Sequence, residues 1–243
     1  MTPEQEQEII RLRAANLTPK QIAKQLKLKP ADVIAAIKLR AEQTAIVTSD
    51  GLPPIAECLI NKTAKLALLG GQEDDEDGTS GLATILVARG LPHRNWTVAS
   101  YLVDYWCLGV KDVIPPKSMT KDKYALFVSR YFERSPEGSD RISLEQAQSI
   151  IYGSIEYARK LGFQPARDFE QAREHLGNPS QLQELKFGRN GKPYYISGPY
   201  DDTNRIMKTL QNSIGDDNFN FVTEVPQSVL EASKRKWVIE NRE

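Results

Sequence analysis

The stretch LVDYWCLGVKD, residues 102–112, decides how the larger part of the chain is interpreted. Seven of its eleven residues are apolar, as in a strand that is buried inside a sheet. Asp104 interrupts the apolar run, and Lys111 and Asp112 end it. A carboxylate among aromatic side chains has a raised pKa unless it is paired. Asp104 is therefore either a general acid or metal ligand, or a structural group that forms a salt bridge or a backbone hydrogen bond.

Two hairpins are predicted around this stretch. The segment 81–90 is a predicted strand, and 98–110 is the predicted return strand of an antiparallel hairpin. A second hairpin is predicted over 184–202, because Asn190-Gly191 is a strong turn dipeptide between apolar residues.

Helices are expected between and beside these hairpins. They are predicted over the ranges 55–69, 119–132, 143–162, 168–177 and 202–215. Pro115 and Pro116 are expected to break the chain after the first hairpin. A closing strand is expected at 218–222. Antiparallel pairs with helices, rather than an alternating βαβ series, predict an α+β domain.

The first 45 residues predict three helices, over 4–15, 19–26 and 30–43. Thr18 is a good N-cap and Pro19 suits the first helical position. The spacing within 17–40 is typical of a helix-turn-helix. The residues expected to form its shared core are Ile22, Ala23, Leu26, Leu28, Val33, Ile34 and Ile37. The segment resembles the three-helix DNA-binding units of recombinase and sigma-factor type.

A DNA-binding role is predicted for the basic side chains of this segment. They are Lys20, Lys24, Lys29, Lys38 and Arg40, all suited to phosphate contact. The predicted recognition helix carries few base-reading side chains, so a single unit would bind weakly and a homodimer is expected. Lys27 occupies a turn position where glycine is common, because the turn often needs positive φ. The alternative is a module for protein contact or dimerisation.

Several stretches of the larger domain together resemble an uncharacterised family of bacterial proteins. They are GLATILVARG, YLVDYWCLGVKD, IIYGSIEYARKLGFQP followed by DFEQA, and FGRNGKPYYISGPYDD. These stretches cover most of residues 52–222. The resemblance implies a defined domain and no particular reaction.

The candidate catalytic groups of the larger domain are carboxylates. They are Asp104, Asp112, Asp201 and Asp202. If they converged, they would suit a divalent ion and metal-dependent hydrolysis. Otherwise, Asp201 or Asp202 would cap the helix that begins at Thr203.

Other reactive groups give weaker signals. The acidic run EDDED at 73–77 does not match an EF-hand loop and is expected to be a solvated loop. Cys107 has no convincing base, because the only imidazoles are His93 and His175. We therefore predict neither a metal site nor a cofactor.

Composition limits the class of protein. The net charge is zero, so any nucleic-acid signal is local. No run of about 18 apolar residues is present, and no secretory signal is visible. With only Cys58 and Cys107, reduced thiols and a cytoplasmic location are expected.

The predicted organisation is a helix-turn-helix domain at 1–45, a linker at 46–54, an α+β domain at 55–225 and a helical tail at 226–243. The leading functional prediction is a DNA-binding protein, such as a transcriptional regulator, whose larger domain serves assembly or ligand binding. The alternatives are a hydrolase or nuclease recruited to nucleic acid, and a non-enzymatic protein-interaction scaffold.

Overall fold

The computed structural model divides the chain into two compact units, Met1–Pro54 and Ile55–Glu243. The residues it describes are 3–14, 17–43, 51–70, 81–91, 94–133, 135, 137–179 and 181–223. For residues 3, 4, 14 and 38–43 the description covers the backbone alone. The acidic run at 73–77 and the tail predicted at 226–243 lie outside the described residues.

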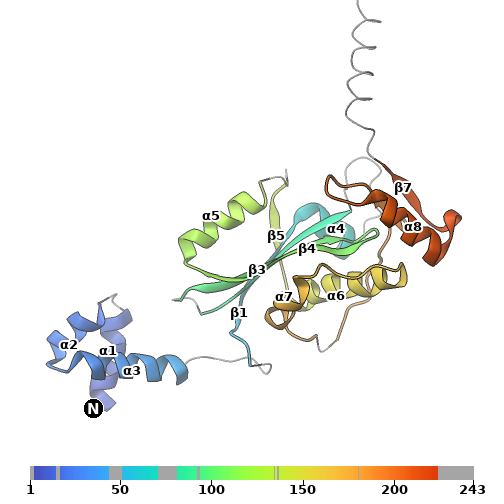
Figure 1. The fold of residues 1–243 in the computed structure, drawn as a ribbon. Helices are drawn as coiled ribbons and strands as arrows, with labels where there is room; N and C mark the ends of the chain where they lie inside the picture. The colour runs from blue at the N-terminus through green and yellow to red at the C-terminus, as the bar shows by residue number, and fades with distance from the viewer. Residues whose placement is uncertain are drawn as a thin grey trace, which may run out of the picture. The chain divides into compact units, whose positions relative to one another are not determined.

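The first unit contains three helices, α1 (Pro3–Ala14), α2 (Pro19–Leu26) and α3 (Pro30–Gln43) (Figure 1). Thr18 begins α2 with a capping box: its hydroxyl accepts from the N–H of Gln21, and the Gln21 side chain accepts from the N–H of Thr18. The buried side chains of this unit come from all three helices. They are Ile9, Leu12, Ile22, Ala23 and Val33.

Most of the predicted interior of this unit is confirmed by burial. Ile22 and Val33 are fully buried, and Leu26 and Leu28 pack partly buried against them. The prediction for Ile34 is wrong, since its side chain is 53% exposed. The face of α3 that packs against the core carries Val33 and Ile37. Ile34 follows Val33 directly, so its side chain points about 100° around the helix from that face and reaches solvent.

The second unit is built on a five-stranded antiparallel sheet in the order β4-β3-β2-β1-β5. The strands are β1 (Ile55–Asn61), β2 (Leu82–Arg89), β3 (Trp96–Asp104), β4 (Gly109–Met119) and β5 (Ser139–Ile142). The β2–β3 pair confirms the first predicted hairpin.

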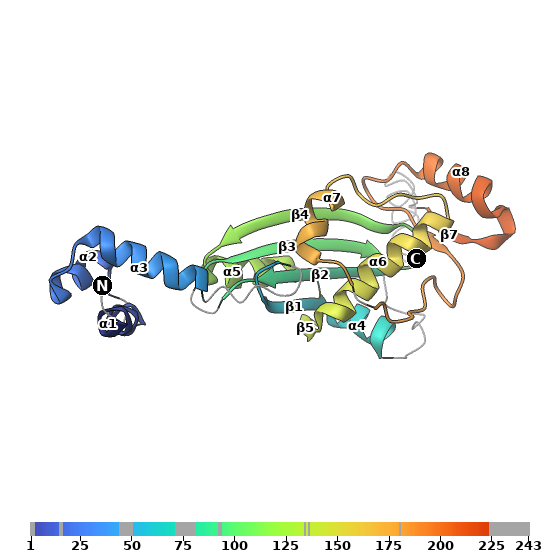
Figure 2. The ribbon, with the colours of Figure 1, turned by 90° about the horizontal axis from the view of Figure 1, so that it is seen from below.

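Helices cover both faces of this sheet (Figures 1 and 2). One face packs against α6 (Leu144–Lys160) and α7 (Phe169–Leu176), and the other against α5 (Lys121–Tyr131). Because side chains alternate along a strand, neighbours on β1 enter different cores: Cys58 packs on the α6 side and Leu59 on the α5 side. These three helices lie where the sequence predicts them.

The helix predicted over 55–69 is wrong in its first half. The chain there is strand β1 followed by α4 (Lys62–Leu69). β1 lies between β2 and β5 and is buried on both faces toward its end, so its apolar run has no clear alternation. Periodicity alone does not separate such a strand from a buried helix.

The strand predicted over 98–110 is in fact two strands. β3 ends at Asp104, residues 105–108 form a turn, and β4 returns from Gly109. Pro115 and Pro116 do not break the chain, because they lie inside β4. They fall where the β3–β4 register shifts, on the strand at the edge of the sheet. A bulge on an edge strand tolerates proline, since no ladder hydrogen bond is needed there.

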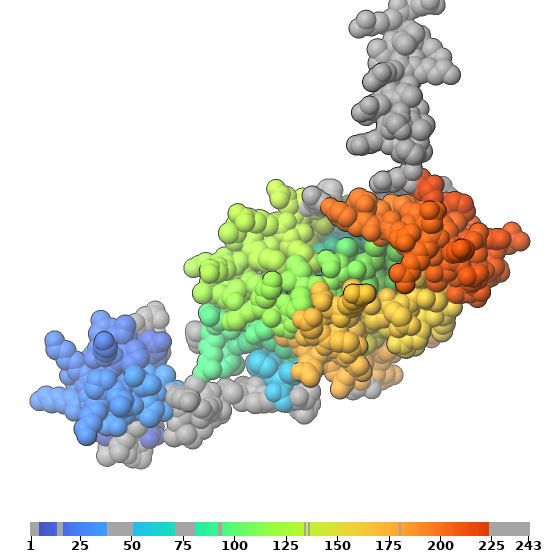
Figure 3. Space-filling view, in the orientation of Figure 1, coloured from blue at the N-terminus to red at the C-terminus, as the bar shows by residue number. Residues whose placement is uncertain are grey.

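The C-terminal part of this unit contains a small second sheet. Its residues belong to the orange to red part of the chain, which lies at one end of the unit (Figure 3). The predicted Asn190-Gly191 turn is present, with φ of 52° and 77°. Its arms form only a single bridge, Arg189 to Lys192. The second hairpin is otherwise wrong, because β6 (Tyr194–Ile196) pairs in parallel with β7 (Asn220–Val222).

Between these two strands runs α8 (Thr203–Ile214), followed by the short 3-10 helix η1 (Asp216–Asn218). The helix predicted over 202–215 and the strand predicted over 218–222 are therefore confirmed. In the parts of the chain that the structure describes, no helix is long and apolar enough to cross a membrane.

Candidate functional site

Asp104 ends β3 and holds the following turn in place. Its Oδ1 accepts hydrogen bonds from the backbone N–H groups of Trp106 (3.0 Å) and Cys107 (2.9 Å). The side chain is buried, and burial raises the pKa of Asp104 to about 6, partly offset by these backbone hydrogen bonds and by the charge of Lys111. Of the roles predicted for Asp104, the structure contains the backbone hydrogen bond.

Lys111 lies in a bulge of β4. Leu102 pairs with Asp112 and Val103 pairs with Val110, so Lys111 is the extra residue between the two pairs. A bulge redirects the side chain of the residue it inserts. Here the Nζ of Lys111 lies 2.8 Å from Oδ2 of Asp201.

The Lys111–Asp201 ion pair joins the sheet to the loop before α8. The side chains are 20% and 12% exposed, so the pair is shielded from solvent. The same Oδ2 of Asp201 accepts from the N–H of Gly198 at 2.9 Å and from the hydroxyl of Tyr195 at 3.4 Å. A shielded pair with added hydrogen bonds is costly to break by removing one partner.

A cavity of about 150 Å³ opens beside Asp104 and Lys111. Its apolar lining comes from Leu82, Trp106, Tyr194 and Ile196. Its polar lining comes from Asp104, Lys111, Ser197 and Gly198. Strand ends, the β3–β4 turn and the segment after β6 thus meet at one small hollow.

The aromatic part of this lining is held by a third charged group. The rings of Trp106 and Tyr194 pack edge to face, with centroids 5.5 Å apart. The guanidinium of Arg189 lies 5.2 Å and 4.9 Å from the two centroids, a cation–π arrangement. The indole Nε1 of Trp106 is buried and finds no hydrogen-bond acceptor among the described residues.

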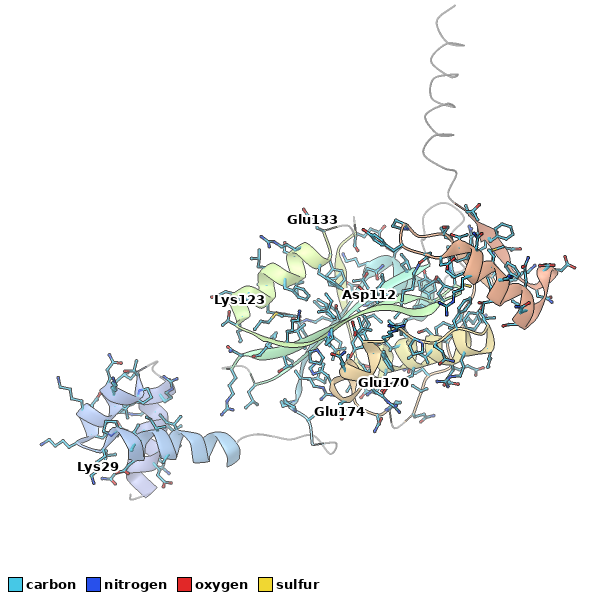
Figure 4. The ribbon with its side chains drawn as sticks, viewed as in Figure 1. Lys29, Asp112, Lys123, Glu133, Glu170 and Glu174 are labelled. Atoms are coloured by element: carbon cyan, nitrogen blue, oxygen red, sulfur yellow. The ribbon has the colours of Figure 1, made fainter. Side chains whose placement is uncertain are left out.

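Only two of the four candidate carboxylates come near this cavity. Asp104 and Asp201 both interact with Lys111. Asp202 caps α8 instead, with Oδ1 accepting from the N–H of Arg205 at 3.1 Å, as one of the two alternatives predicted. Asp112, labelled in Figure 4, is exposed. Burial and, to a smaller extent, the negative charge of Asp112 raise the pKa of Tyr131 in α5.

Metal binding needs several donors at one place. Within the described ranges, no group of three or more His, Cys, Asp or Glu side chains is arranged to hold a metal ion. The charged groups at the cavity form an ion pair instead, between Lys111 and Asp201.

The thiols are both free and buried. Burial raises the pKa of Cys58 to about 12 and raises that of Cys107 further. His175 is also buried, and its Nε2 lies 3.1 Å from the carbonyl oxygen of Val87. His93 lies outside the described residues. These surroundings suit core packing and do not activate a nucleophile.

The predicted DNA-binding lysines lie on the first unit. Lys20 and Lys24 are exposed on α2, one turn apart. Lys29, labelled in Figure 4, is exposed directly before α3. Lys38 and Arg40 belong to α3, but their side chains lie outside the description. Lys27, which was not among the predicted contacts, is exposed in the turn between the helices.

Sequence reasoning gave no structural role to two side chains that organise the second unit, Trp106 and Arg89, and it did not pair Lys111 with Asp201. Arg89 is 1% exposed, and its Nε donates to the carbonyl of His175 at the end of α7 at 2.6 Å. An arginine inside the apolar run ILVARG is a signal that could have identified it, because buried arginine is rare unless it is paired. The pairing of Lys111 with Asp201, 90 positions away, left no local signal.

Comparison with known proteins adds no relative. No family model matches the chain, and no curated protein or solved structure matches it either. The likeness to an uncharacterised bacterial family, and that to helix-turn-helix units, therefore remain predictions from the sequence.

Proposed function

We propose that the protein binds DNA through its first unit, used as a helix-turn-helix, and that the contacts are made chiefly to phosphate. The observation that carries the proposal is the basic surface of α2 and the turn after it: Lys20, Lys24, Lys27 and Lys29 are all exposed. Within the described side chains of 17–37 they are opposed by a single acid, Asp32. In a helix-turn-helix, the first of the two helices crosses the DNA backbone, where lysines suit phosphate.

The exposed side of α3 favours weak base discrimination. Its first two turns expose Ala31, Asp32, Ile34 and Ala35. None of these offers the bidentate hydrogen bonds with which Arg, Asn or Gln distinguish bases in the major groove. Affinity should then depend strongly on salt and little on sequence.

The test is titration of duplex DNA with the full chain at salt concentrations between about 50 and 200 mM. One variant carries Lys20→Gln, Lys24→Gln, Lys27→Gln and Lys29→Gln together. We expect at least a tenfold loss of affinity at about 100 mM salt, and a salt slope reduced by up to about 3.6, since each phosphate contact contributes about 0.9.

A charge-matched control exists in the second unit. Lys117, Lys123, Lys160 and Lys208 are exposed, and their replacement by Gln removes the same total charge. DNA affinity should be nearly unchanged in this control. Equal losses in the two variants, or binding by the full chain that does not respond to salt, would overturn the proposal.

A second role for the same helix is favoured by Ile34. Its side chain is 53% exposed and is flanked by exposed Ala31 and Ala35, so α3 presents an apolar strip. Such a strip suits contact with a protein, including a second copy of the chain. Sedimentation without DNA, comparing the parent with Ile34→Gln, tests this: a dimer lost in the variant supports it, and a parent that is monomeric at every concentration removes the homodimer.

The larger unit would serve ligand binding or assembly in this scheme. Both cysteines are buried free thiols, which accords with the cytoplasmic location that the proposal assumes. Hydrolysis is not part of the proposal, because the four candidate carboxylates do not converge: Asp112 is exposed near Tyr131, and Asp202 caps α8.

A further inference from the structure

The cavity beside the β3–β4 turn presents opposite charges at its polar end and apolar groups elsewhere. Asp104 and Lys111 are its charged lining groups. Leu82, Ile196 and the rings of Trp106 and Tyr194 supply the apolar part. We propose that this cavity binds a small zwitterion, an α-amino acid with an apolar side chain.

Lys111 has donors to offer such a ligand. An ammonium group carries three N–H donors, and Asp201 takes one of them at 2.8 Å. The side chain keeps 20% of its surface exposed and lines the cavity. A ligand carboxylate can therefore share the ammonium of Lys111 with Asp201.

Asp104 supplies the complementary group. Asp104 lines the cavity and lies close enough to Lys111 for the charge of Lys111 to favour its ionised form. In an α-amino acid the ammonium and the carboxylate are attached to the same carbon, so adjacent opposite charges in the protein match adjacent opposite charges in the ligand. The ligand ammonium would face Asp104.

The balance of charge around the cavity favours a zwitterion over a simple ion. Asp104 and Asp201 oppose a bare anion, while Lys111 and the guanidinium over the aromatic rings, Arg189, oppose a bare cation. A zwitterion adds no net charge and satisfies each side with its opposite. Charged groups are costly to bury without such pairing.

Gly198 forms part of the polar end of the cavity. A Cβ at this position would lie 3.3 Å from Nζ of Lys111 and 3.2 Å from Oδ2 of Asp201. The backbone can approach the ion pair closely because the residue has no side chain. The backbone at Gly198 therefore forms a wall of the cavity directly against the ion pair.

The volume limits the ligand side chain. A cavity near 150 Å³ is comparable to one that takes up a single benzene ring. Because Asp104 and Lys111 line the same cavity, this space also holds the charged end of the ligand, so the apolar group is no larger than a valine or leucine side chain and contacts the aromatic and aliphatic walls. Leucine is the probe that we choose.

The test uses the full chain and the indole N–H signals of its tryptophans in a nitrogen-15 correlation spectrum. The chain has three tryptophans, Trp96, Trp106 and Trp237, and Trp96→Phe and Trp237→Phe assign the signal of Trp106. Four probes are compared: leucine, 3-methylbutylamine (which lacks the carboxylate), 4-methylpentanoate (which lacks the ammonium) and glycine (which lacks the side chain).

We expect a saturable shift of the Trp106 signal with millimolar leucine. The amine, the acid and glycine should bind at least about tenfold more weakly, because each has lost one charged or apolar contact. No saturable shift with leucine overturns the proposal. Equal binding of the amine or of the acid also overturns it, because recognition would then rest on one charge alone.

Two variants place the site. Lys111→Gln removes the cation and should weaken leucine binding at least about tenfold. Ile196→Phe narrows the cavity without altering a charged group and should weaken it likewise. Lys117→Gln, an exposed lysine on the same strand, is the control and should bind as the parent does. Full affinity for leucine in both Lys111→Gln and Ile196→Phe would show that leucine binds outside this cavity, and would overturn the assignment.

Discussion

Asp104 shows how one buried carboxylate specifies a turn. Two consecutive N–H groups, of Trp106 and Cys107, donate to the same oxygen, so the chain reverses directly after β3. Buried backbone donors need partners, and a side-chain acceptor supplies them where the ladder stops. The acid in the middle of an apolar run is thus explained by the backbone it holds, and its place beside Lys111 makes it available to a ligand as well.

Substitution of Asp104 should separate its two properties. Asp104→Asn keeps a carbonyl oxygen for the two N–H groups, so we expect a change within about 1 kcal/mol of the parent at pH 4, where the parent carboxyl is protonated. Asp104→Ala leaves two buried donors without an acceptor and should destabilise the second unit by about 2–4 kcal/mol. Urea unfolding followed by Trp fluorescence measures both. A larger loss in the Asn variant than in the Ala variant would contradict the capping role.

The pH dependence of stability should carry the signature of Asp104. Burial raises its pKa from 3.8 to about 6, so the folded chain holds a proton that the unfolded chain releases between these values. The stabilisation of the folded chain that comes from this proton is fully present below pH 3.8 and is lost as pH rises through 6. A rise of about two pKa units corresponds to on the order of 3 kcal/mol.

That loss should be absent from Asp104→Asn. We therefore expect the difference in unfolding free energy, parent minus variant, to become less favourable by up to about 3 kcal/mol between pH 4 and pH 7. Other carboxylates titrate equally in both proteins and cancel in the difference. A flat difference across this range would show that the pKa of Asp104 is not raised.

At the scale of elements, the turn between α2 and α3 depends on a lysine in a left-handed conformation. Lys27 has φ 54° and ψ 38°, and its N–H donates to the carbonyl of Ala23 to close α2. A residue with a Cβ is strained there by about 1–2 kcal/mol, whereas glycine adopts the conformation freely.

Lys27→Gly should therefore stabilise the first unit by about 0.5–1 kcal/mol, after the entropy cost of glycine in the unfolded chain is subtracted. Amide hydrogen exchange of α2 in the full chain measures the change. Lys24→Gly, inside α2, is the matched control and should destabilise by about 1 kcal/mol. Faster exchange in Lys27→Gly than in the parent would contradict the left-handed turn.

Gly109 plays the corresponding part at the start of β4. Its φ is +69°, and a Cβ there would lie 2.7 Å from Cβ of Ala158 and 2.9 Å from the carbonyl oxygen of Ser154. Both atoms belong to α6, so the turn and the helix meet at a position that only glycine fits. The β3–β4 turn is thereby fixed against α6.

Gly109→Ala should destabilise the second unit by about 2–4 kcal/mol, from backbone strain and overpacking together. Thermal unfolding gives the measurement. Gly191→Ala is the control, since Gly191 also has positive φ, +77°, but nothing lies within 4 Å of its added Cβ. If both variants lost the same free energy of unfolding, the close contact of Gly109 with α6 would make no measurable contribution to stability.

Local chemistry made some elements predictable and left others hidden. Thr18 and Ser143 begin helices with capping boxes. The hydroxyl residue and the glutamine of each box are only three positions apart in the sequence. β1 was mistaken for a helix because both of its faces are buried. The two bulges of β4, and with them the direction of Lys111, depend on pairing with β3 and not on the residues of β4 alone.

The candidate site shows the same division. Asp104 was singled out from the sequence because it interrupts an apolar run, and Asp201 because it lies in a turn directly before a helix. Which of them meet was not predictable, because Lys111 and Asp201 are 90 positions apart and are joined only when α8 folds beside the sheet end. The parallel pairing of β6 and β7 was hidden for the same reason, since a whole helix separates the two strands.

On the scale of the whole molecule, each compact unit has a hydrophobic core of its own. The first unit buries Ile9, Leu12, Ile22, Ala23 and Val33, and the cores of the second unit draw only on residues after 54. The two proposed activities therefore belong to different cores: DNA binding to the first unit and leucine binding to the second. Loss of one core should remove one activity.

Ile22→Ala tests this separation. Ile22 is fully buried, and its truncation costs about 2–5 kcal/mol, comparable to the stability of so small a unit. We expect fast amide exchange in α1–α3 and loss of DNA binding, with the leucine-induced shift of Trp106 retained. Ile34→Ala removes the same atoms from a side chain that is 53% exposed, and its α1–α3 amides should exchange as in the parent.

Each result assigns an activity to a unit. DNA binding that persists while α1–α3 exchange freely would place the DNA contacts outside the first unit. A leucine response lost together with DNA binding would show that the cavity depends on the first core, although its lining residues all come from the second unit. Because the lysines and the cavity lie in units with separate buried cores, we expect neither result, and the two proposals can fail independently.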